Sequence, residues 1–162
     1  MKESLDFQVG NLLRERGLKL ALAESCTGGL IGDRITNTPG SSDYFVGGVV
    51  AYAYSAKADL LGVSWDTLNS KGAVSQETVL EMARGARRVF GADIAVSISG
   101  IAGPGGGTAD KPVGTTWVGL VAPDGEWAKR FQFSGIREQN KASAADAALQ
   151  MLLDYLLGNL KK

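Results

Sequence analysis

The first segment of the chain carries apolar residues at a helical spacing. Four of its apolar positions fall on one face of a helix: Leu5, Val9, Leu12 and Leu13. Gly17 follows them, and glycine commonly ends a helix because it adopts a left-handed backbone conformation without strain. The pattern therefore predicts an amphipathic helix over about residues 3–16.

Short apolar runs farther along the chain predict β-strands. Three of these runs cover residues 18–23, 45–54 and 94–99. Their length and their aliphatic, aromatic and β-branched residues are typical of buried strands. Two further runs, over residues 113–122 and 127–133, flank the turn-forming segment Pro123-Asp124-Gly125, which predicts a hairpin.

Helical patterns alternate with these strands. They cover about residues 30–35, 56–61, 75–89 and 138–157. Gly62 ends the second pattern, and Ser75 offers N-cap chemistry to the third. Alternating strands and helices are typical of layered α/β folds. We therefore expect residues 1–162 to form a single three-layer α/β/α domain with a mixed sheet.

Composition narrows the classes of function. Seventeen basic residues balance seventeen acidic ones without a block of like charge, which argues against nucleic-acid binding. With no histidine and only one cysteine, Cys26, the chain offers no ligand cluster for zinc or a redox metal, and we predict no metal site. The lone cysteine and the lack of a signal-peptide or membrane-spanning pattern favour a cytoplasmic protein.

Ser25 stands where a predicted strand gives way to a glycine-containing helix start. There the N–H groups of Thr27, Gly28 and Gly29, together with the helix dipole, would stabilise a developing oxyanion, which makes Ser25 a candidate nucleophile. The competing interpretation is that Ser25 only caps the helix, because serine is a favoured N-cap. Without histidine a Ser-His-Asp triad is impossible, so the base must be another residue type.

Tyr52 and Lys57 place a phenol and an amine near the end of a predicted strand. To act as a base near neutral pH, Lys57 would need a pKa about three units below its reference of about 10.4, which burial can supply. The Tyr52 hydroxyl would then relay a proton between Ser25 and Lys57. The Tyr-x4-Lys spacing matches neither the Tyr-x3-Lys nor the Ser-x2-Lys motif, and a solvated lysine is the competing interpretation.

A glycine-rich loop follows the predicted strand 94–99. Its candidate ligand-binding residues are Gly100, Gly103, Gly105, Gly106, Gly107 and Thr108. Backbone amides of such loops can cradle an anion, although this loop lacks the Walker ending and the dinucleotide spacing. Arg137, at the start of the last predicted helix, is a candidate for bidentate phosphate binding. A flexible surface loop and a surface arginine are the competing interpretations.

Several long motifs of the chain are shared with one known family. They are Ala23-Glu-Ser-Cys-Thr-Gly-Gly29, Thr38-Pro-Gly-Ser-Ser42, Val49-Val-Ala-Tyr52, Ala56-Lys57, Gly72-Ala-Val-Ser75, Ser97-Ile-Ser-Gly-Ile-Ala-Gly-Pro-Gly-Gly-Gly-Thr108 and Lys111-Pro-Val-Gly114. Through these motifs, over about residues 4–157, the chain resembles the C-terminal domain of the CinA competence/damage-inducible proteins.

The resemblance implies a nicotinamide-nucleotide amidase of NAD salvage. Such an enzyme hydrolyses the carboxamide of nicotinamide mononucleotide to give nicotinate mononucleotide and ammonia. The family's serine, tyrosine and lysine fall on Ser25, Tyr52 and Lys57, and its arginine falls on Arg137. The glycine loop and Arg137 would hold the ribose and phosphate, and no metal or cofactor is implied.

Among the departures from the usual family pattern, two stand beside the candidate residues. Tyr54 stands where the family usually has asparagine, and Ile136 replaces the aspartate that usually precedes the arginine. Larger members of the family carry a preceding nucleotide-pyrophosphatase domain, so we expect a free-standing deamidase at 162 residues.

The expected partner is a small-molecule nucleotide substrate, with no nucleic acid and no membrane. We also expect a homo-oligomer, a dimer or higher, because small enzymes commonly form symmetric assemblies. The alternative function is a non-catalytic nucleotide-binding or regulatory module, linked to competence or DNA damage, that uses the same glycine loop.

Overall fold

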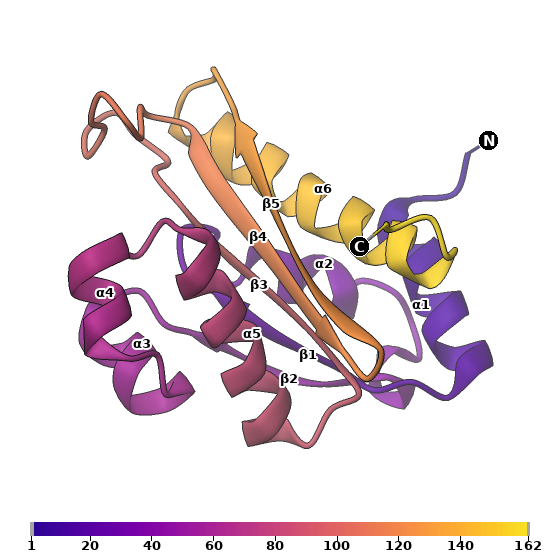
Figure 1. The fold of residues 1–162 in the computed structure, drawn as a ribbon. Coiled ribbons are helices and arrows are strands. Elements are labelled where there is room, and N and C mark those ends of the chain that lie inside the picture. The colour runs from indigo at the N-terminus through magenta and orange to yellow at the C-terminus, as the bar shows by residue number, and fades with distance from the viewer. Residues whose placement is uncertain (1, 162) are drawn as a thin grey trace.

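The computed structural model describes residues 2–161, which form a five-stranded sheet with helices on both faces (Figure 1). The strands are β1 (Leu20–Glu24), β2 (Phe45–Val50), β3 (Ile94–Gly100), β4 (Thr115–Ala122) and β5 (Gly125–Gln132). The helices are α1 (Leu5–Arg16), α2 (Leu30–Thr36), α3 (Tyr54–Leu61), α4 (Trp65–Lys71), α5 (Gln76–Phe90) and α6 (Arg137–Leu156). A short 3-10 helix covers Ser41–Asp43.

The sheet is mixed, as the sequence predicts. Its strand order is β2-β1-β3-β4-β5. β1 lies parallel to both β2 and β3, whereas β4 runs antiparallel to β3 and β5. The carboxyl ends of the three parallel strands therefore meet at one edge of the sheet, which is where open α/β sheets bind ligands.

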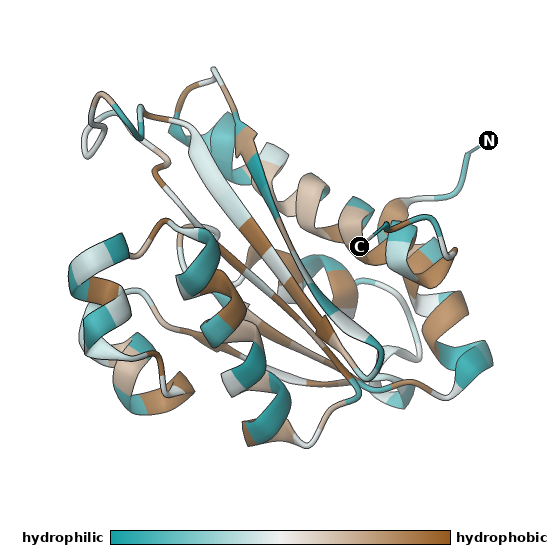
Figure 2. Ribbon diagram, viewed as in Figure 1, coloured by the Kyte–Doolittle hydropathy of each residue, from teal (hydrophilic) through white to brown (hydrophobic). Residues whose placement is uncertain are grey.

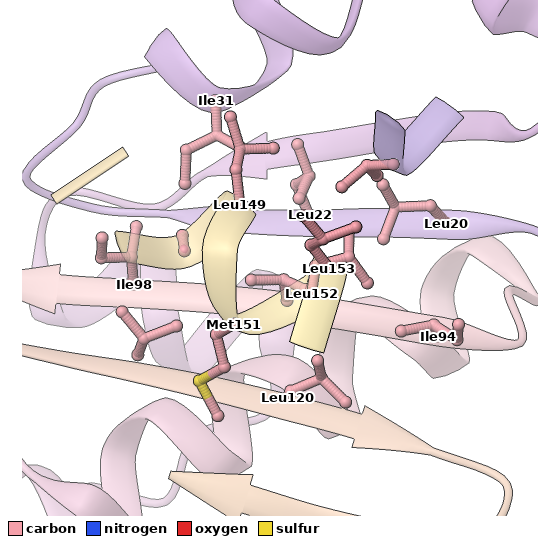
Figure 3. Packing of buried hydrophobic residues seen from close by; sticks show 14 of the residues in the cluster. Leu20, Leu22, Ile31, Ile94, Ile98, Leu120, Leu149, Met151, Leu152 and Leu153 are labelled. Carbon is pink, nitrogen blue, oxygen red and sulfur yellow. The ribbon is translucent and has the colours of Figure 1, made fainter. Parts of the chain in front are cut away.

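Side chains of successive strand residues point to opposite faces of the sheet and divide the core in two. Leu20 and Leu22 of β1 pack with α1, α2 and α6, and Figure 3 shows Leu22 near Leu149 and Leu153 of α6 in this cluster. The smaller Ala21 lies on the other face, against residues of α3, α4 and α5. Figure 2 shows apolar residues along the strands and on the helix faces toward the sheet, with hydrophilic residues outside. The three-layer α/β/α prediction is confirmed.

The predicted helices α1 and α5 are confirmed, with the predicted end at Gly17 and the predicted N-cap at Ser75, and the structure adds Ser4 as the N-cap of α1. Ser4 begins α1 by accepting a hydrogen bond from Phe7 N, and Gly17 ends it with a φ of 63°. Ser75 begins α5 in the same way by accepting from Thr78 N. These local signals set the two helices because each side-chain oxygen satisfies a backbone donor that the first turn leaves free.

The structure corrects the predicted boundaries between residues 45 and 75. The strand predicted over 45–54 ends at Val50, because the carbonyls of Ala51 and Tyr52 turn toward the amine of Lys57 instead of a neighbouring strand. Helix α3 accordingly begins at Tyr54 and not at residue 56. The sequence reading missed α4, a short helix with Leu68 as its one buried residue and hence no apolar stripe to detect.

The β4–β5 hairpin is tighter than predicted, because Ala122 pairs directly with Gly125 and only Pro123 and Asp124 form the turn.

Among the described residues, no helix combines the length and the apolar character that crossing a membrane requires.

Candidate active site

The candidate residues gather where the parallel strands end. Ser25 directly follows β1, Tyr52 comes shortly after β2, and Gly100 ends β3. The amide of Ser25 donates to Ile98 O at 3.0 Å, which extends the β1–β3 ladder by one residue. On the other side the amide of Ala51 donates to Glu24 O at 2.9 Å. The sheet thus fixes the backbone around Ser25 from two neighbouring strands.

Lys57 and Ser25 are in direct contact although 32 positions separate them. Lys57 Nζ lies 3.0 Å from Ser25 Oγ and 2.9 Å from the carbonyl oxygens of both Ala51 and Tyr52. Lys57 is 1% exposed and Ser25 7%. The interpretation of Lys57 as a solvated lysine is therefore wrong. The interpretation of Ser25 as a helix cap is also wrong, because the N-cap of α2 is Gly29.

Burial changes the acid–base chemistry of this amine. Removal from water disfavours the ammonium form and lowers the pKa of Lys57 from 10.5 to about 8, against a smaller opposing effect of Cys26. As a neutral amine, Lys57 has two N–H donors, which match the two carbonyl oxygens of Ala51 and Tyr52. Its lone pair is then free to accept the proton of the Ser25 hydroxyl. The arrangement suits a general base acting on a serine.

The turn after Ser25 leaves backbone donors free. Gly28 N donates to Ser25 O at 3.0 Å, so this amide is already used and is not available as the sequence suggested. Within residues 2–161, the amides of Cys26, Thr27 and Gly29 donate to no backbone acceptor. Thr27 and Gly29 therefore keep the free N–H groups expected of them, and Cys26 adds a third that sequence reasoning did not include. Free amides beside a nucleophile are the usual donors of an oxyanion hole.

The helix dipole does not act as the sequence suggested. Helix α2 begins five residues after Ser25, at Leu30. The amides of Ile31 and Gly32 in its first turn donate to the buried carboxylate of Glu24, at 2.9 and 3.0 Å. Sequence reasoning missed Glu24, since a helix is usually capped by the residue next to it. No local pattern marks a carboxylate that reaches forward from the preceding strand to the helix.

Tyr52 and Arg137 form a second, exposed part of the site. Arg137 Nη2 donates to the Tyr52 hydroxyl at 3.0 Å, and Arg137 Nη1 donates to Gly103 O at 2.7 Å. The Tyr52 side chain is 59% exposed. Arg137 therefore links the end of β2, the glycine loop and α6. The contact between Lys57 and Ser25 is direct, so the proton relay through Tyr52 has no place in this arrangement.

The glycine loop divides into two parts. Gly103 is buried beside Arg137, and a cavity of about 560 Å³ lies between residues 102–104 and residues 135–138. Gly100 is half-buried, the glycines at 105–107 and Thr108 are exposed, and the loop projects beyond the sheet in Figure 1. Gly106 and Thr108 line a separate cavity of about 210 Å³. Gly100 and Gly103 are thus close to the strand ends, whereas the rest of the predicted loop set lies farther out: Gly105, Gly106, Gly107 and Thr108.

Asn140 is a second residue that sequence reasoning missed. It is 3% exposed, and its Nδ2 donates to Ala102 O at 3.0 Å while its Oδ1 accepts from Gly135 N at 2.9 Å. It therefore ties the loop before Gly103 to the segment before Arg137. The only signal in the sequence was its position one helical turn after Arg137, the predicted phosphate-binding residue. A polar residue within a helix is usually solvated.

The two departures from the family pattern have different environments. The Tyr54 hydroxyl accepts from Ala73 N at 3.3 Å, and its ring centroid lies 6.5 Å from that of Trp65. Tyr54 thus holds the α4–α5 connection and makes no hydrogen bond to Ser25 or Lys57 within the described residues. Ile136 is 67% exposed and lines the larger cavity beside Arg137. Ile136 therefore lies beside Arg137, whereas Tyr54 lines the smaller cavity with Gly106 and Thr108.

Comparison with known proteins identifies the family. The CinA C-terminal domain matches residues 2–156. A CinA-like protein of Chlorobaculum tepidum is 53% identical over 155 residues, which are 93% of this chain and 37% of the relative. A CinA-like protein of Geotalea uraniireducens is 50% identical over 155 residues, 96% of this chain and 37% of the relative. The chain therefore spans little more than a third of the length of these curated relatives.

Solved structures agree with this match. The crystal structure of a competence damage-inducible protein A from Klebsiella pneumoniae is 37% identical with a TM-score of 0.91, over 94% of this chain and 95% of that chain. A competence/damage inducible protein from Agrobacterium tumefaciens is also 37% identical, with a TM-score of 0.88 over 97% and 98% of the two chains. The described chain belongs to the CinA C-terminal domain family.

Proposed function

We propose that this chain is a nicotinamide-nucleotide amidase that hydrolyses nicotinamide mononucleotide to nicotinate mononucleotide and ammonia. The observation that carries the proposal is the buried amine of Lys57, 3.0 Å from the Ser25 hydroxyl and with two carbonyl oxygens for its N–H groups. A purely structural lysine gains nothing from burial beside a serine, because desolvation destabilises its charge. The geometry supports the reaction type, and the family resemblance supplies the substrate.

In the proposed first half of the reaction, Ser25 Oγ attacks the carboxamide carbon while its proton passes to the neutral Lys57 Nζ. The resulting ammonium then gives that proton to the amide nitrogen as the C–N bond breaks, and ammonia leaves. In the second half, water attacks the acyl ester and gives a proton to Lys57. Ser25 takes that proton back as the C–O bond breaks, and the carboxylic acid product is released.

The negative charge that develops on the carboxamide oxygen needs donors close to Ser25. The free amides of Cys26, Thr27 and Gly29 supply them, because they have no backbone acceptor within the described residues. Removing one such donor costs roughly a hundredfold to a thousandfold in kcat in serine enzymes.

Recognition of the nucleotide is assigned to the exposed part of the site. Arg137 uses two of its N–H donors on Tyr52 and Gly103, which leaves donors of its guanidinium for a phosphate. The neighbouring cavity of about 560 Å³ falls within the range of about 300–1,000 Å³ typical of small-ligand sites. A nucleotide there would extend from Arg137 toward Ser25. We retain a homo-oligomeric cytoplasmic enzyme as part of the proposal.

The proposal is tested by incubating the purified protein with nicotinamide mononucleotide and measuring ammonia and nicotinate mononucleotide together. Equal amounts of both products are expected from the wild type. Ser25→Ala should lower kcat by about a thousandfold or more, as loss of the nucleophile does in serine hydrolases. The matched control is Ser70→Ala, which removes an exposed hydroxyl that only contacts Asp66 O, and it should retain full activity.

Folded wild-type protein that forms neither product would contradict the amidase. If it still binds nicotinamide mononucleotide, the non-catalytic nucleotide-binding module becomes the better interpretation.

A further inference from the structure

Glu24 is a buried acidic residue to which the proposed reaction gives no step. It immediately precedes Ser25 and is 3% exposed. Its Oε1 accepts hydrogen bonds from Ile31 N at 2.9 Å and from the Thr27 hydroxyl at 2.6 Å. Its Oε2 accepts from Gly32 N at 3.0 Å. Three donors therefore satisfy a carboxylate that would otherwise be costly to bury.

These contacts make Glu24 the remote cap of α2. The N-cap position is held by Gly29, which has no side chain to cap with. The backbone of Glu24 belongs to the sheet, because its carbonyl accepts from Ala51 N, while its side chain binds the first turn of the helix. Glu24 therefore fixes both ends of the five-residue turn 25–29: its backbone holds the end at β1, and its side chain holds the end at α2. Thr27, in the middle of this turn, is held by its hydroxyl.

We propose that Glu24 is a positioning residue for catalysis, an inference that rests on the proposed function. By occupying the amides of Ile31 and Gly32, the carboxylate removes the helix start as an alternative site for the developing oxyanion. By holding Thr27, it fixes the turn in which Cys26, Thr27 and Gly29 keep free amides and Ser25 Oγ meets Lys57. Misplacement of reacting groups by about 1 Å can cost about a hundredfold in rate.

Glu81, which is half-buried, makes similar contacts away from the Ser25–Lys57 pair. Glu81 Oε2 accepts from Ser64 N at 2.8 Å and its Oε1 accepts from the Thr67 hydroxyl at 2.6 Å. It thereby supports the start of α4 as Glu24 supports the start of α2. Within the described residues, neither Glu81 nor Thr67 has a hydrogen bond to Ser25 or Lys57. Glu81 is a matched control for a role in helix capping alone.

The test compares Glu24→Gln with Glu81→Gln in the intact protein. Glutamine keeps the size of the side chain but places an NH2 group where one oxygen accepts a hydrogen bond. Both variants should remain folded by circular dichroism. The expected result for Glu24→Gln is a kcat lower by roughly tenfold to a hundredfold with KM changed less than about threefold. Glu81→Gln should keep the kcat and KM of the wild type.

Three further variants separate a catalytic effect from a folding defect. Thr27→Val removes one hydroxyl at nearly constant volume and breaks only the 2.6 Å contact with Glu24. It should lower kcat severalfold, Thr27→Ser should restore most of the loss, and Thr67→Val should have no effect on kcat. Rescue by serine separates the hydrogen bond from side-chain packing.

A substrate-independent readout separates this inference from the proposed function. A fluorophosphonate reagent forms a Ser25 Oγ–P bond with loss of fluoride, and the labelling rate is followed by intact-protein mass. If the wild type is labelled at Ser25 but does not turn over nicotinamide mononucleotide, the substrate assignment fails. Slower labelling of Glu24→Gln then still supports positioning. Wild-type kcat and wild-type labelling rates in both Glu24→Gln and Thr27→Val would overturn the inference and leave Glu24 as a helix cap.

Discussion

The candidate active site has two parts that differ in their contact with water. The Ser25–Lys57 pair is buried and is held by backbone groups of the sheet and of the segment after β2. The Tyr52–Arg137 pair is bound through side chains at the surface, and Tyr52 is 59% exposed. Arg137 also reaches the glycine loop through Gly103 O.

The difference in exposure divides the proposed work between the two parts. A buried amine loses hydration, and its pKa falls to a value at which a base can function. An exposed guanidinium keeps its charge and can exchange a neutral partner for a phosphate. Proton transfer is therefore assigned to the buried pair and nucleotide recognition to the exposed pair. Variants of the two pairs should change different kinetic constants.

The largest effect is expected in the buried pair. Lys57→Met keeps an unbranched side chain but removes the base, so kcat should fall by about a hundredfold to ten-thousandfold. Steady-state deamidation of nicotinamide mononucleotide measures the change. The control is Lys71→Met. Lys71 is exposed, and its amine forms a long surface ion pair with Glu77, at 4.0 Å, which contributes little to stability. A Lys57→Met variant with the kcat of the wild type would remove Lys57 from the mechanism.

In the wild type, the buried pair should also give the activity its pH dependence. Below pH 8 Lys57 is mostly an ammonium ion, which cannot accept the Ser25 proton, and above it the neutral amine dominates. The value of kcat/KM should therefore rise with pH and level off above an inflection near 8. A profile that stays flat between pH 6 and pH 10 would contradict a basic role for this amine.

An intermediate effect is expected at Arg137. Arg137→Ala removes the charged contact to the nucleotide, and such contacts contribute about 1.5–3 kcal/mol, or roughly tenfold to a hundredfold. The loss should appear mainly in KM. Arg137→Lys should recover part of it, because lysine keeps the charge but not the planar pair of donors. A variant whose kcat falls while KM stays constant would assign Arg137 to the chemical step instead.

The smallest effect is expected at Tyr52. Tyr52→Phe removes only the exposed hydroxyl that accepts from Arg137, so kcat/KM should fall by a few-fold at most. The backbone carbonyl of Tyr52 that accepts from Lys57 stays in place. A loss of activity as large as that of Lys57→Met would show that the Tyr52 hydroxyl carries the proton of Ser25. Proton transfer would then no longer belong to the buried pair alone.

Much of the fold was predictable because its signals are local. The apolar stripe of α1 and the serine caps of α1 and α5 lie within single segments. Helix α4 was missed because Leu68 alone faces the core and a single residue makes no period. The end of β2 was placed too late because Ala51 and Tyr52 fit a strand in composition, while the amine that turns their carbonyls lies beyond them.

The candidate site was predictable in its residue types but not in its contacts. Motifs shared with the family nominated Ser25, Lys57 and Arg137. The direct Lys57–Ser25 contact depends on how the folded chain brings α3 to the residue after β1, which no local pattern encodes. Carbonyl partners of Lys57 carry no signal, because every residue has a carbonyl group. Glu24 and Asn140 act through neighbours that only the folded chain brings to them.

The most direct test of the central claim, that burial turns Lys57 into a base for Ser25, is the pKa of Lys57 in the free protein. It is measured by NMR titration of ¹³C-labelled lysine, with the Lys57 signal assigned by its absence in Lys57→Met. The expected value is about 8, because burial disfavours the ammonium ion. Titration near the ordinary value of 10.5 would contradict the claim, since the neutral fraction at pH 7 would then fall from roughly a tenth to less than about a thousandth, too little to accept the proton of Ser25.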